Sequence, residues 1–232
     1  MVTEIELFNE DCMEGMKRYP DKYFELAIVD PPFREDNQPT QTMRNFNTSM
    51  KQWNKPPDRQ YFGELFRVSQ NQIIHGGNYF TNVLDPNNNW IVWYKNNDGV
   101  GFSMCELFWS SIERNIKLFD FRPMGNNGDK IHPTQKPVKL YEWLLKNYAK
   151  QGDKILDTHL GSGSIAIACF NLDFSLTGFE IDKDYYEAAC KRFEEHKKQQ
   201  GLFNKPLPVQ MAEKGTIAGM FGVNSRYRDG MD

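Results

Sequence analysis

Short apolar runs alternate along the chain with longer runs in which apolar residues are spaced more widely. The short runs are rich in β-branched and aromatic residues and are bounded by Gly, Pro, Asn or Asp, which is typical of buried strands. Alternation of strands with helices favours an α/β fold with a mostly parallel sheet and helices on both faces. The predicted strands are 25–29, 72–76, 90–94, 106–112, 154–158 and 174–180, and the predicted helices are 61–69, 137–149, 164–172 and 183–200.

Three segments depart from this pattern. Residues 34–60 are polar and rich in Asn, Gln and Pro, and residues 95–130 include "KNNDGVG" and "FRPMGNNGDK". Irregular segments of this length in a compact domain usually carry function or lack fixed structure. Residues 201–232 mix Pro, Gly and Met without a clear period. We therefore predict one domain over residues 1–200 with two long loops, followed by a C-terminal tail or arm over 201–232.

The composition is that of a globular chain. Hydrophobic residues make up 39% of the 232 residues, and no apolar run approaches the about 20 residues that a membrane-spanning helix needs. The opening "MVTEIELFNEDCMEG" carries acids where a signal peptide has a basic start and an apolar core. We therefore expect a cytoplasmic protein that does not contact a membrane.

Cysteine spacing and charge add little on their own. The four cysteines show no CxxC spacing, which argues against a zinc site or a disulfide framework. The net charge of −3 does not indicate nucleic-acid binding, although whole-chain charge can hide a local patch. Residues 111–150 carry eight Lys or Arg against four Asp or Glu, and residues 34–60 carry five against three. On charge alone, ordinary surface variation is the favoured explanation.

A glycine-containing loop follows the predicted strand 154–158. The segment "KILDTHLGSGS" places Asp157 at the end of the strand and Gly161 and Gly163 before a predicted helix. Glycines there allow a tight turn and a close approach of the backbone to a ligand. The next predicted strand ends at Glu180, where an acid is placed to accept hydrogen bonds from ribose hydroxyls. Strand, loop, helix, strand and acid in this order predict a nucleotide-like cofactor.

The charge beside the loop favours one cofactor over another. Dinucleotide enzymes use the spacing GxGxxG, and the third position here would be Ala166. Asp157 would repel the pyrophosphate of a dinucleotide, but it suits the sulfonium and amino groups of S-adenosyl-L-methionine. The alternative that the loop is only a structural turn remains open, and the two acids argue against it.

A second short motif, "IVDPPF" at 28–33, ends another predicted strand. Methylation of an exocyclic amine is difficult because the nitrogen lone pair is delocalised into the ring. Asp30 and the carbonyl of Pro31 offer two acceptors for the amine protons, and the second proline stiffens the turn. Phe33 offers a flat face on which an extruded base can stack. The sequence therefore predicts methyl transfer to a base amine by positioning and electrostatics, without a covalent enzyme intermediate.

Four motifs in this order resemble those of the amino-group DNA methyltransferases. They are "DPPF", "HPTQKP" at 132–137, "LDTHLGSGS" at 156–164 and "GFEID" at 178–182. The catalytic motif precedes the cofactor loop, which is similar to the circularly permuted β class, and the similarity covers roughly residues 5–195. It implies a Rossmann-like methyltransferase fold and transfer from S-adenosyl-L-methionine to N6 of a flipped adenine in double-stranded DNA. A homodimer is compatible with the resemblance.

The resemblance also implies roles for individual residues. The variable region 95–130 is expected to read the DNA sequence, and residues 34–60 are expected to form a further DNA-contacting loop. The implied catalytic residues are Asp30, Pro31, Pro32 and Phe33. The implied cofactor-binding residues are Asp11, Cys12, Thr134, Lys136, Pro137, Asp157, His159, Gly161, Ser162, Gly163, Ser164, Glu180 and Ile181, and the DNA-binding candidates are Arg34, Arg44, Lys51, Lys95 and Arg122.

The sequence departs from the family pattern at two places. Thr158 and His159 replace the usual Pro-Phe beside the glycine loop, and Phe33 stands where tyrosine is commoner. We interpret His159 as a packing or capping residue. Residues 75–78, "HGGN", shape the floor of the cofactor pocket or only form a turn. Trp90 and Trp93 are expected to pack into the core from one side of a strand.

Three other functions are compatible with these motifs. Cytosine N4 presents the same kind of amine, but the family tendency is Asp before the prolines for adenine and Ser for cytosine. Enzymes that methylate a protein glutamine or RNA usually carry the cofactor loop ahead of the catalytic motif, which is the reverse of the order here. A degenerate fold that binds DNA or cofactor without turnover is disfavoured by the intact "DPPF" and supported only by Thr158 and His159.

Overall fold

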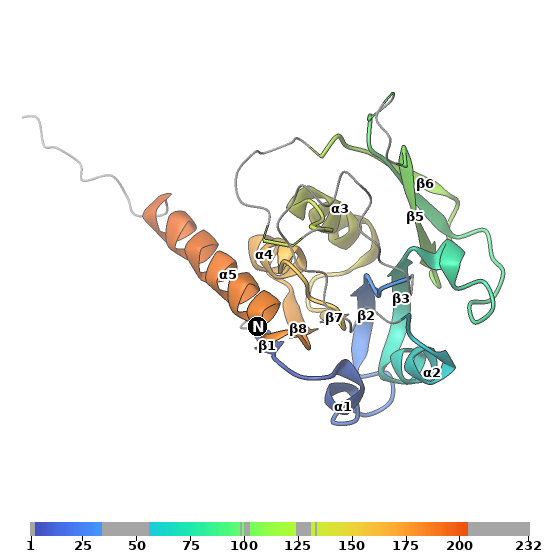
Figure 1. The fold of residues 1–232 in the computed structure, drawn as a ribbon, viewed down its shortest axis with the longest axis horizontal. Helices are drawn as coiled ribbons and strands as arrows, with labels where there is room; N and C mark the ends of the chain where they lie inside the picture. Colours follow the sequence, from blue (N-terminus) through green and yellow to red (C-terminus); the bar gives the residue numbers. More distant parts are fainter. Residues whose placement is uncertain are drawn as a thin grey trace, which may run out of the picture.

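The computed structural model describes residues 3–33, 56–97, 99, 103–123, 131–132 and 134–203. Strands and helices alternate over most of this range, as the sequence predicts (Figure 1). The strands are β1 (Ile5–Phe8), β2 (Phe24–Val29), β3 (Ser69–His75), β4 (Trp90–Tyr94), β5 (Cys105–Ser110), β6 (Lys117–Asp120), β7 (Lys154–Asp157) and β8 (Ser175–Phe179). The helices are α1 (Cys12–Met16), α2 (Arg59–Val68), α3 (Val138–Tyr148), α4 (Ser164–Asn171) and α5 (Lys183–Phe203), with a 3₁₀ turn η2 (Gly77–Tyr79).

The described strands form one eight-stranded sheet in the order β1-β8-β7-β2-β3-β5-β4-β6. Every pairing is parallel except those of β5, which runs antiparallel to both β3 and β4. The predicted α/β fold with a mostly parallel sheet is therefore confirmed. Because β5 alone is reversed, its first residues lie at the same edge as the last residues of the other strands.

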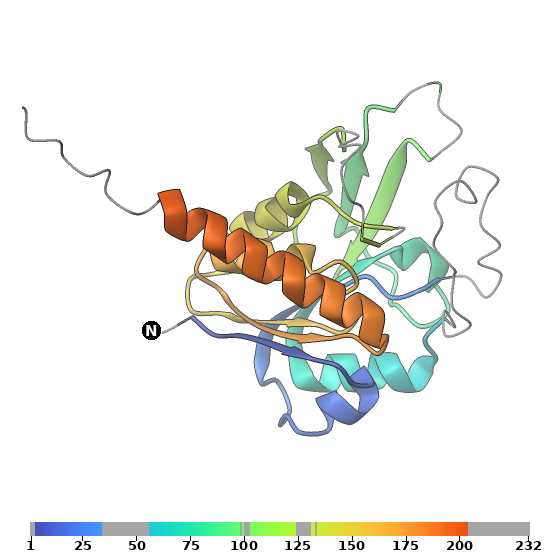
Figure 2. The same ribbon diagram turned by 60° about the vertical axis from the view of Figure 1, so that its left-hand side comes forward.

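Helices cover both faces of the sheet (Figure 2). Successive residues of a strand point to opposite faces, and β2 shows this clearly. Leu26 and Ile28 pack in a core with α3, α4 and α5, whereas Ala27 and Val29 pack in a second core with α1 and α2. Burial on both faces explains why the central strands read as continuous apolar runs.

All six predicted strands and all four predicted helices are present, with ends that differ by a few residues. The sequence missed β1, α1, η2 and β6. Strand β6 lies inside the segment 95–130, which we expected to be irregular apart from the predicted strand 106–112, and all of β5 lies there too. One packing expectation is wrong: Trp93 joins the core with α3, whereas Trp90 packs against the opposite core. They are three positions apart, and a strand's period of two places such residues on opposite faces.

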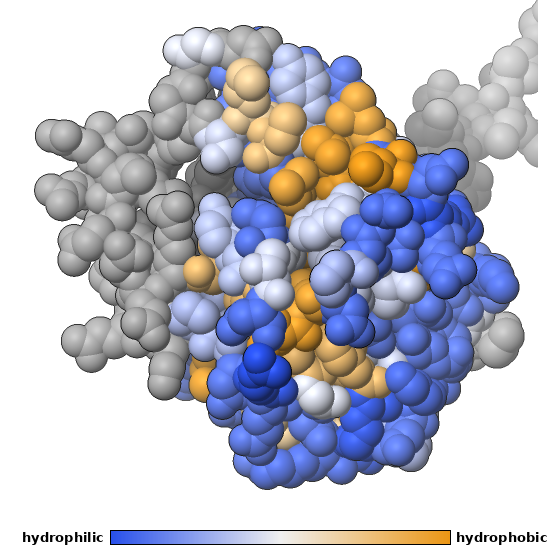
Figure 3. All heavy atoms as spheres, turned by 90° about the vertical axis from the view of Figure 1, so that its right-hand side faces the viewer, coloured by the Kyte–Doolittle hydropathy of each residue, from blue (hydrophilic) through white to orange (hydrophobic). Residues whose placement is uncertain are grey.

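Strand β6 is the last strand of the sheet at one side, and large apolar side chains are exposed there. Ile116 and Leu118 are 62% and 60% exposed. Figure 3 looks onto this side of the molecule and shows an apolar patch in orange toward the top. Among the described helices, none is long and apolar enough to cross a membrane. The predicted tail at 201–232 lies outside the described residues from 204 onward, so the predicted domain boundary stays a prediction.

Candidate active site

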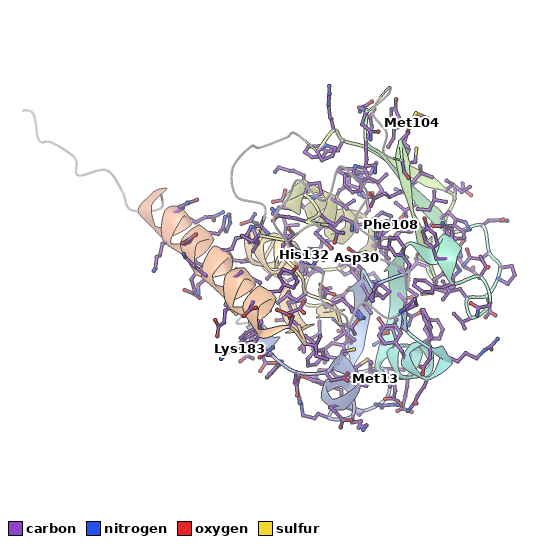
Figure 4. The ribbon with its side chains drawn as sticks, viewed as in Figure 1. Met13, Asp30, Met104, Phe108, His132 and Lys183 are labelled. Carbon is purple, nitrogen blue, oxygen red and sulfur yellow. The ribbon has the colours of Figure 1, made fainter. Side chains whose placement is uncertain are left out.

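Acidic side chains gather at the edge where the parallel strands end. Asp30 follows β2, Asp157 ends β7 and Glu180 follows β8. These three strands are neighbours or near neighbours in the sheet, so their carboxyl ends lie close together. Ligands of open α/β sheets bind at this edge. Figure 4 shows Asp30 near the middle of the molecule and His132 on the α4 side of it.

Asp30 is held by two cationic side chains. Its Oδ2 accepts a hydrogen bond from Lys136 Nζ at 2.6 Å, and its Oδ1 contacts His75 Nδ1. The Asp30 side chain is 18% exposed. Burial alone would raise the pKa of Asp30, but His75 and Lys136 outweigh it and hold this pKa well below its ordinary value. Asp30 is therefore a carboxylate at neutral pH.

The pairing continues away from Asp30. His75 Nε2 lies 2.6 Å from Glu106 Oε2, and Lys95 donates a 3.0 Å hydrogen bond to Glu106 Oε1. Glu106 Oε2 is buried and accepts no well-aligned hydrogen bond from the described residues, so its contact with His75 is an ion pair. Burial opposes ionisation of Glu106, but His75, Lys136 and Lys95 lower its pKa to about 2. We call Asp30, His75, Glu106, Lys95 and Lys136 the paired cluster.

The topology of the sheet explains the paired cluster. His75 ends β3 and Lys95 follows β4, while Glu106 is the second residue of β5. Because β5 is antiparallel to both neighbours, Glu106 lies at the edge where β3 and β4 end. The sequence left two roles for His75, one at the site and one in a simple turn. In the structure His75 lies at the site. No pattern in the sequence indicates that Glu106 joins it, because the alternation of elements does not show that β5 is reversed.

Phe33 lies over the turn that follows β3. Its ring stacks on Tyr79, with centroids 4.5 Å apart and planes 5° apart. Gly76 lies beneath it with φ +66°, and a Cβ there would stand 2.8 Å from the Phe33 ring. A side chain at position 76 would therefore displace Phe33. Pro31 is buried and Pro32 is half-buried, so the turn is fixed from within the protein.

The glycine loop between β7 and α4 connects the other motifs. Gly161 and Gly163 have φ of +53° and +69°, which favour glycine. The Gly161 amide donates a 2.8 Å hydrogen bond to Glu180 Oε2. Ser164 Oγ donates to the carbonyl of Lys136 at 2.7 Å and contacts Ser162 Oγ at 3.1 Å. The loop therefore fixes both the acid after β8 and the segment that carries Lys136.

Asp157 and Glu180 differ from Asp30 because neither forms an ion pair with a described residue. Asp157 is 2% exposed and accepts a hydrogen bond from the His159 amide at 3.0 Å. Burial raises the pKa of Asp157 to about 8 and also raises the pKa of Glu180. We call these two residues the acidic cluster. Two buried acids beside a glycine loop suit a ligand that brings positive charge and hydroxyl donors, which S-adenosyl-L-methionine does.

Two expected cofactor residues lie after β1. Asp11 is the N-cap of α1 and accepts a hydrogen bond from the Met13 amide at 2.8 Å. Cys12 is the first residue of α1, and burial raises its thiol pKa to about 12. Asn9 donates a 2.8 Å hydrogen bond from Nδ2 to the carbonyl of Glu180, which joins this segment to the end of β8. The structure thus brings Asp11 and Cys12 to the β8 side of the site.

The remaining expected cofactor residues lie around the glycine loop. Ile181 is 53% exposed just after Glu180. Thr134 Oγ1 contacts His132 Nδ1 at 3.1 Å, and Pro137 is the N-cap residue of α3. The imidazole of His132 lies 3.7 Å from where a Cβ of Gly161 would stand, which joins this segment to the loop.

His159 packs rather than pairs with an acid. Its Nδ1 contacts Thr158 Oγ1 at 2.9 Å, and its ring meets Tyr61 edge-on at 5.5 Å. Burial lowers the pKa of His159 to about 4, so the ring is neutral at physiological pH. Tyr61 comes from α2 and contacts Thr158 Oγ1 through its hydroxyl at 2.6 Å. Sequence reasoning missed Tyr61, because its place on a predicted amphipathic helix indicated only core packing.

The DNA-binding candidates have separate outcomes. Arg34, Arg44 and Lys51 lie outside the described residues. Arg122 follows β6 and is exposed. Lys95 was expected to meet DNA from a loop, but it is 9% exposed and its ammonium pairs with Glu106. This position does not favour a phosphate contact by Lys95.

The fold and the acids at the strand ends define the class as Rossmann-like methyltransferases. The sequence model of the N6/N4 DNA methylase family matches residues 36–191, well over half of the chain, and the chain therefore belongs to this family. The family resemblance expected from the four motifs is confirmed, and with it a DNA amino-methyltransferase. S-adenosyl-L-methionine, the expected cofactor, is the methyl donor of this class.

Two curated relatives are similar over most of the chain. The type II methyltransferase M.HpaI of Haemophilus parainfluenzae is 24% identical, over 81% of this chain and 74% of its own length. The type II methyltransferase M2.MboI of Moraxella bovis is 25% identical, over 82% of this chain and 87% of its own.

Two solved structures share the fold. The M1.HpyAVI-SAM complex has a TM-score of 0.58 and 21% identity, covering 81% of this chain and 98% of that one. The cytosine-N4-specific PvuII DNA methyltransferase has a TM-score of 0.60 and 15% identity, covering 88% and 93%.

Proposed function

We propose that this protein transfers a methyl group from S-adenosyl-L-methionine to N6 of an adenine extruded from a specific sequence in double-stranded DNA. The observation that carries the proposal is Asp30, an ionised carboxylate at the end of β2. Asp before the two prolines favours adenine over cytosine. The type II methyltransferases M.HpaI and M2.MboI support a role in site-specific DNA modification.

Asp30 and its turn have the chemistry that an amine acceptor needs. A carboxylate oxygen of Asp30 and the Pro31 carbonyl would accept the two amine protons, which localises the nitrogen lone pair. Pro32 keeps the carbonyl in place, because its ring restricts the backbone on both sides. Phe33 would stack on the extruded base. Tyr79 now covers one face of Phe33, so the base would use the other face or displace Tyr79.

The cofactor would lie between the acidic cluster and Asp30. When bound, it supplies the electrophilic methyl group. Asp157 would face its positive charge, and Glu180 would accept hydrogen bonds from its ribose. The other residues proposed to line its site are Asp11, Cys12, Thr134, Lys136, Pro137, His159, Gly161, Ser162, Gly163, Ser164 and Ile181.

DNA would approach over the edge where the strands end. The two predicted loops, 34–60 and 95–130, are proposed to flank the extruded base, with Arg34, Arg44, Lys51 and Arg122 supplying positive charge. Phosphate contacts by such side chains release counterions. We therefore expect DNA affinity to fall steeply as salt concentration rises.

Nucleoside analysis tests the proposal directly. The purified protein is incubated with S-adenosyl-L-methionine and unmethylated DNA of diverse sequence, and the DNA is digested and examined by mass spectrometry. N6-methyladenine is the expected product. N4-methylcytosine would retain the mechanism and overturn the choice of base. If neither appears although calorimetry shows cofactor binding, the proposed activity on DNA is wrong.

A further inference from the structure

His75 is the most enclosed side chain of the paired cluster, at 4% exposure. One ring nitrogen contacts Asp30 and the other lies 2.6 Å from Glu106. Its ring also packs on Phe108, with centroids 4.7 Å apart, and edge-on against Phe33 at 5.9 Å. The imidazole therefore cannot rotate without losing both carboxylates and its aromatic contacts.

Lys136 holds the other oxygen of Asp30 in a different way. Its ammonium is a compact charge on a flexible side chain. It lies 2.6 Å from Asp30 Oδ2 and 4.0 Å from Glu106 Oε2. A small movement of the ammonium can therefore exchange Asp30 for Glu106 or for the carboxylate of a ligand. Of the two Asp30 oxygens, Oδ1 has a rigid partner and Oδ2 has a movable one.

Building on the proposed function, we infer that His75 is a positioning residue for methyl transfer. It fixes Oδ1 of Asp30, so that Oδ2 alone is presented to the amine of the target base once Lys136 moves aside. Glu106 holds the imidazole in this orientation through its other ring nitrogen, and Lys95 holds Glu106 in place. His75 does not touch the base, because the Asp30 carboxylate stands between them.

The charges around His75 predict how this support responds to pH. The groups that face it are Asp30 after β2, Glu106 on β5 and Lys136 before α3, with Lys95 behind Glu106. Burial and Lys136 oppose a charge on His75, but the two carboxylates outweigh them and raise its pKa above the ordinary value. The charged form of His75 is therefore favoured relative to a free imidazole, and this charge is lost as the pH rises through the raised pKa.

Two substitutions of His75 separate its two contacts. In His75→Asn the amide can replace the contact with Asp30, whereas in His75→Gln it can replace the contact with Glu106. We expect the single-turnover rate of methyl transfer to fall about tenfold more in His75→Gln than in His75→Asn. Cofactor affinity, measured by calorimetry, is expected to stay within about threefold in both variants, because the acidic cluster is intact. His196→Asn, on α5 away from the site, serves as the matched control.

A third substitution tests the charge itself. Glu106→Gln keeps the size of a side chain that is a quarter exposed, so this variant is expected to fold even if the His75 variants do not. Removal of one of the two carboxylates lowers the pKa of His75. The decrease in the wild-type transfer rate that accompanies deprotonation of His75 should therefore move to lower pH. A purely structural role for His75 would not produce this shift.

The outcomes separate this inference from the proposed function. Equal losses in His75→Asn and His75→Gln would overturn the positioning role, and so would a Glu106→Gln profile that coincides with that of the wild type. Both results require a wild-type protein that forms a methylated nucleoside. A wild-type protein that binds cofactor and forms none contradicts the proposed function instead.

Discussion

Two groups of partly or fully buried acids lie on the same edge of the sheet, and their pKa values move in opposite directions. In the paired cluster, Asp30 and Glu106 have lowered pKa values because cationic side chains surround them. In the acidic cluster, Asp157 and Glu180 have raised pKa values because burial is not compensated by a cation from the described residues. Burial is common to both clusters, so the cations make the difference.

The difference shows which cluster needs a ligand to balance its charge. The paired cluster is electrically satisfied by the protein itself, and a substrate amine must compete for an oxygen that Lys136 now occupies. The acidic cluster is satisfied only when a ligand brings positive charge to it. The protein therefore has a preassembled acceptor on one side and an incomplete cofactor site on the other.

Removal of Asp30 should have the largest effect. We expect Asp30→Ala to reduce methyl transfer by about a thousandfold or more, because the amine loses its charged acceptor. Cofactor affinity should change little, since the acidic cluster is untouched. Single-turnover assays and calorimetry measure the two quantities. Asp21→Ala removes an exposed acid before β2, at the opposite end of that strand, and should leave the rate unchanged. An active Asp30→Ala protein would remove Asp30 from the mechanism.

The raised pKa of Asp157 predicts a pH-dependent cofactor affinity. The folded-state value of about 8 means that Asp157 is mostly protonated at neutral pH, and a cationic ligand favours its ionised form. Binding should therefore release a proton, and affinity should rise up to about tenfold per pH unit until the pH passes the pKa of Asp157.

Calorimetry in two buffers of different ionisation enthalpy measures the released proton. Asp157→Asn should remove the proton release and weaken binding under alkaline conditions. Asp173→Asn is the matched control, because Asp173 lies in the turn before β8, away from the loop. Proton release that persists in Asp157→Asn would assign it to another group.

Glu180→Gln should have the smallest effect of the three. Its expected ligand, a ribose, is neutral, and a glutamine oxygen can still accept a hydrogen bond. We expect cofactor affinity to fall about three- to tenfold, with the pH dependence due to Asp157 retained. The exposed Glu187→Gln on α5 provides the comparison. A loss as large as that in Asp157→Asn would show that both acids face the ligand's positive charge.

Much of the site was predictable because strand ends can be read from the sequence. The apolar runs before Asp30, Asp157 and Glu180 predicted three parallel strands, and parallel strands end at one edge. The glycines before α4 predicted the loop that joins β7 to α4.

The paired cluster was not predictable in the same way. The alternation of elements did not show that β5 is reversed, and only this reversal brings Glu106 to His75. The same lack of long-range information left Lys95 assigned to DNA rather than to Glu106. Strands β1 and β6 were missed because four residues give too little period to recognise, whereas the equally short β7 was marked by the glycine loop that follows it.

Arg192 anchors the glycine loop to helix α5. Its Nη1 donates hydrogen bonds to the carbonyl of Ser162 at 2.7 Å and to Ser164 Oγ at 2.9 Å. Arg192 lies near the middle of the 21-residue helix α5, and helices fray from their ends. Several turns can therefore unwind at either end of α5 before the loop loses this clamp. In hydrogen exchange, the loop amides should exchange at the same rate as the amides at the centre of α5. Fraying of the last turns of α5 should not change that rate.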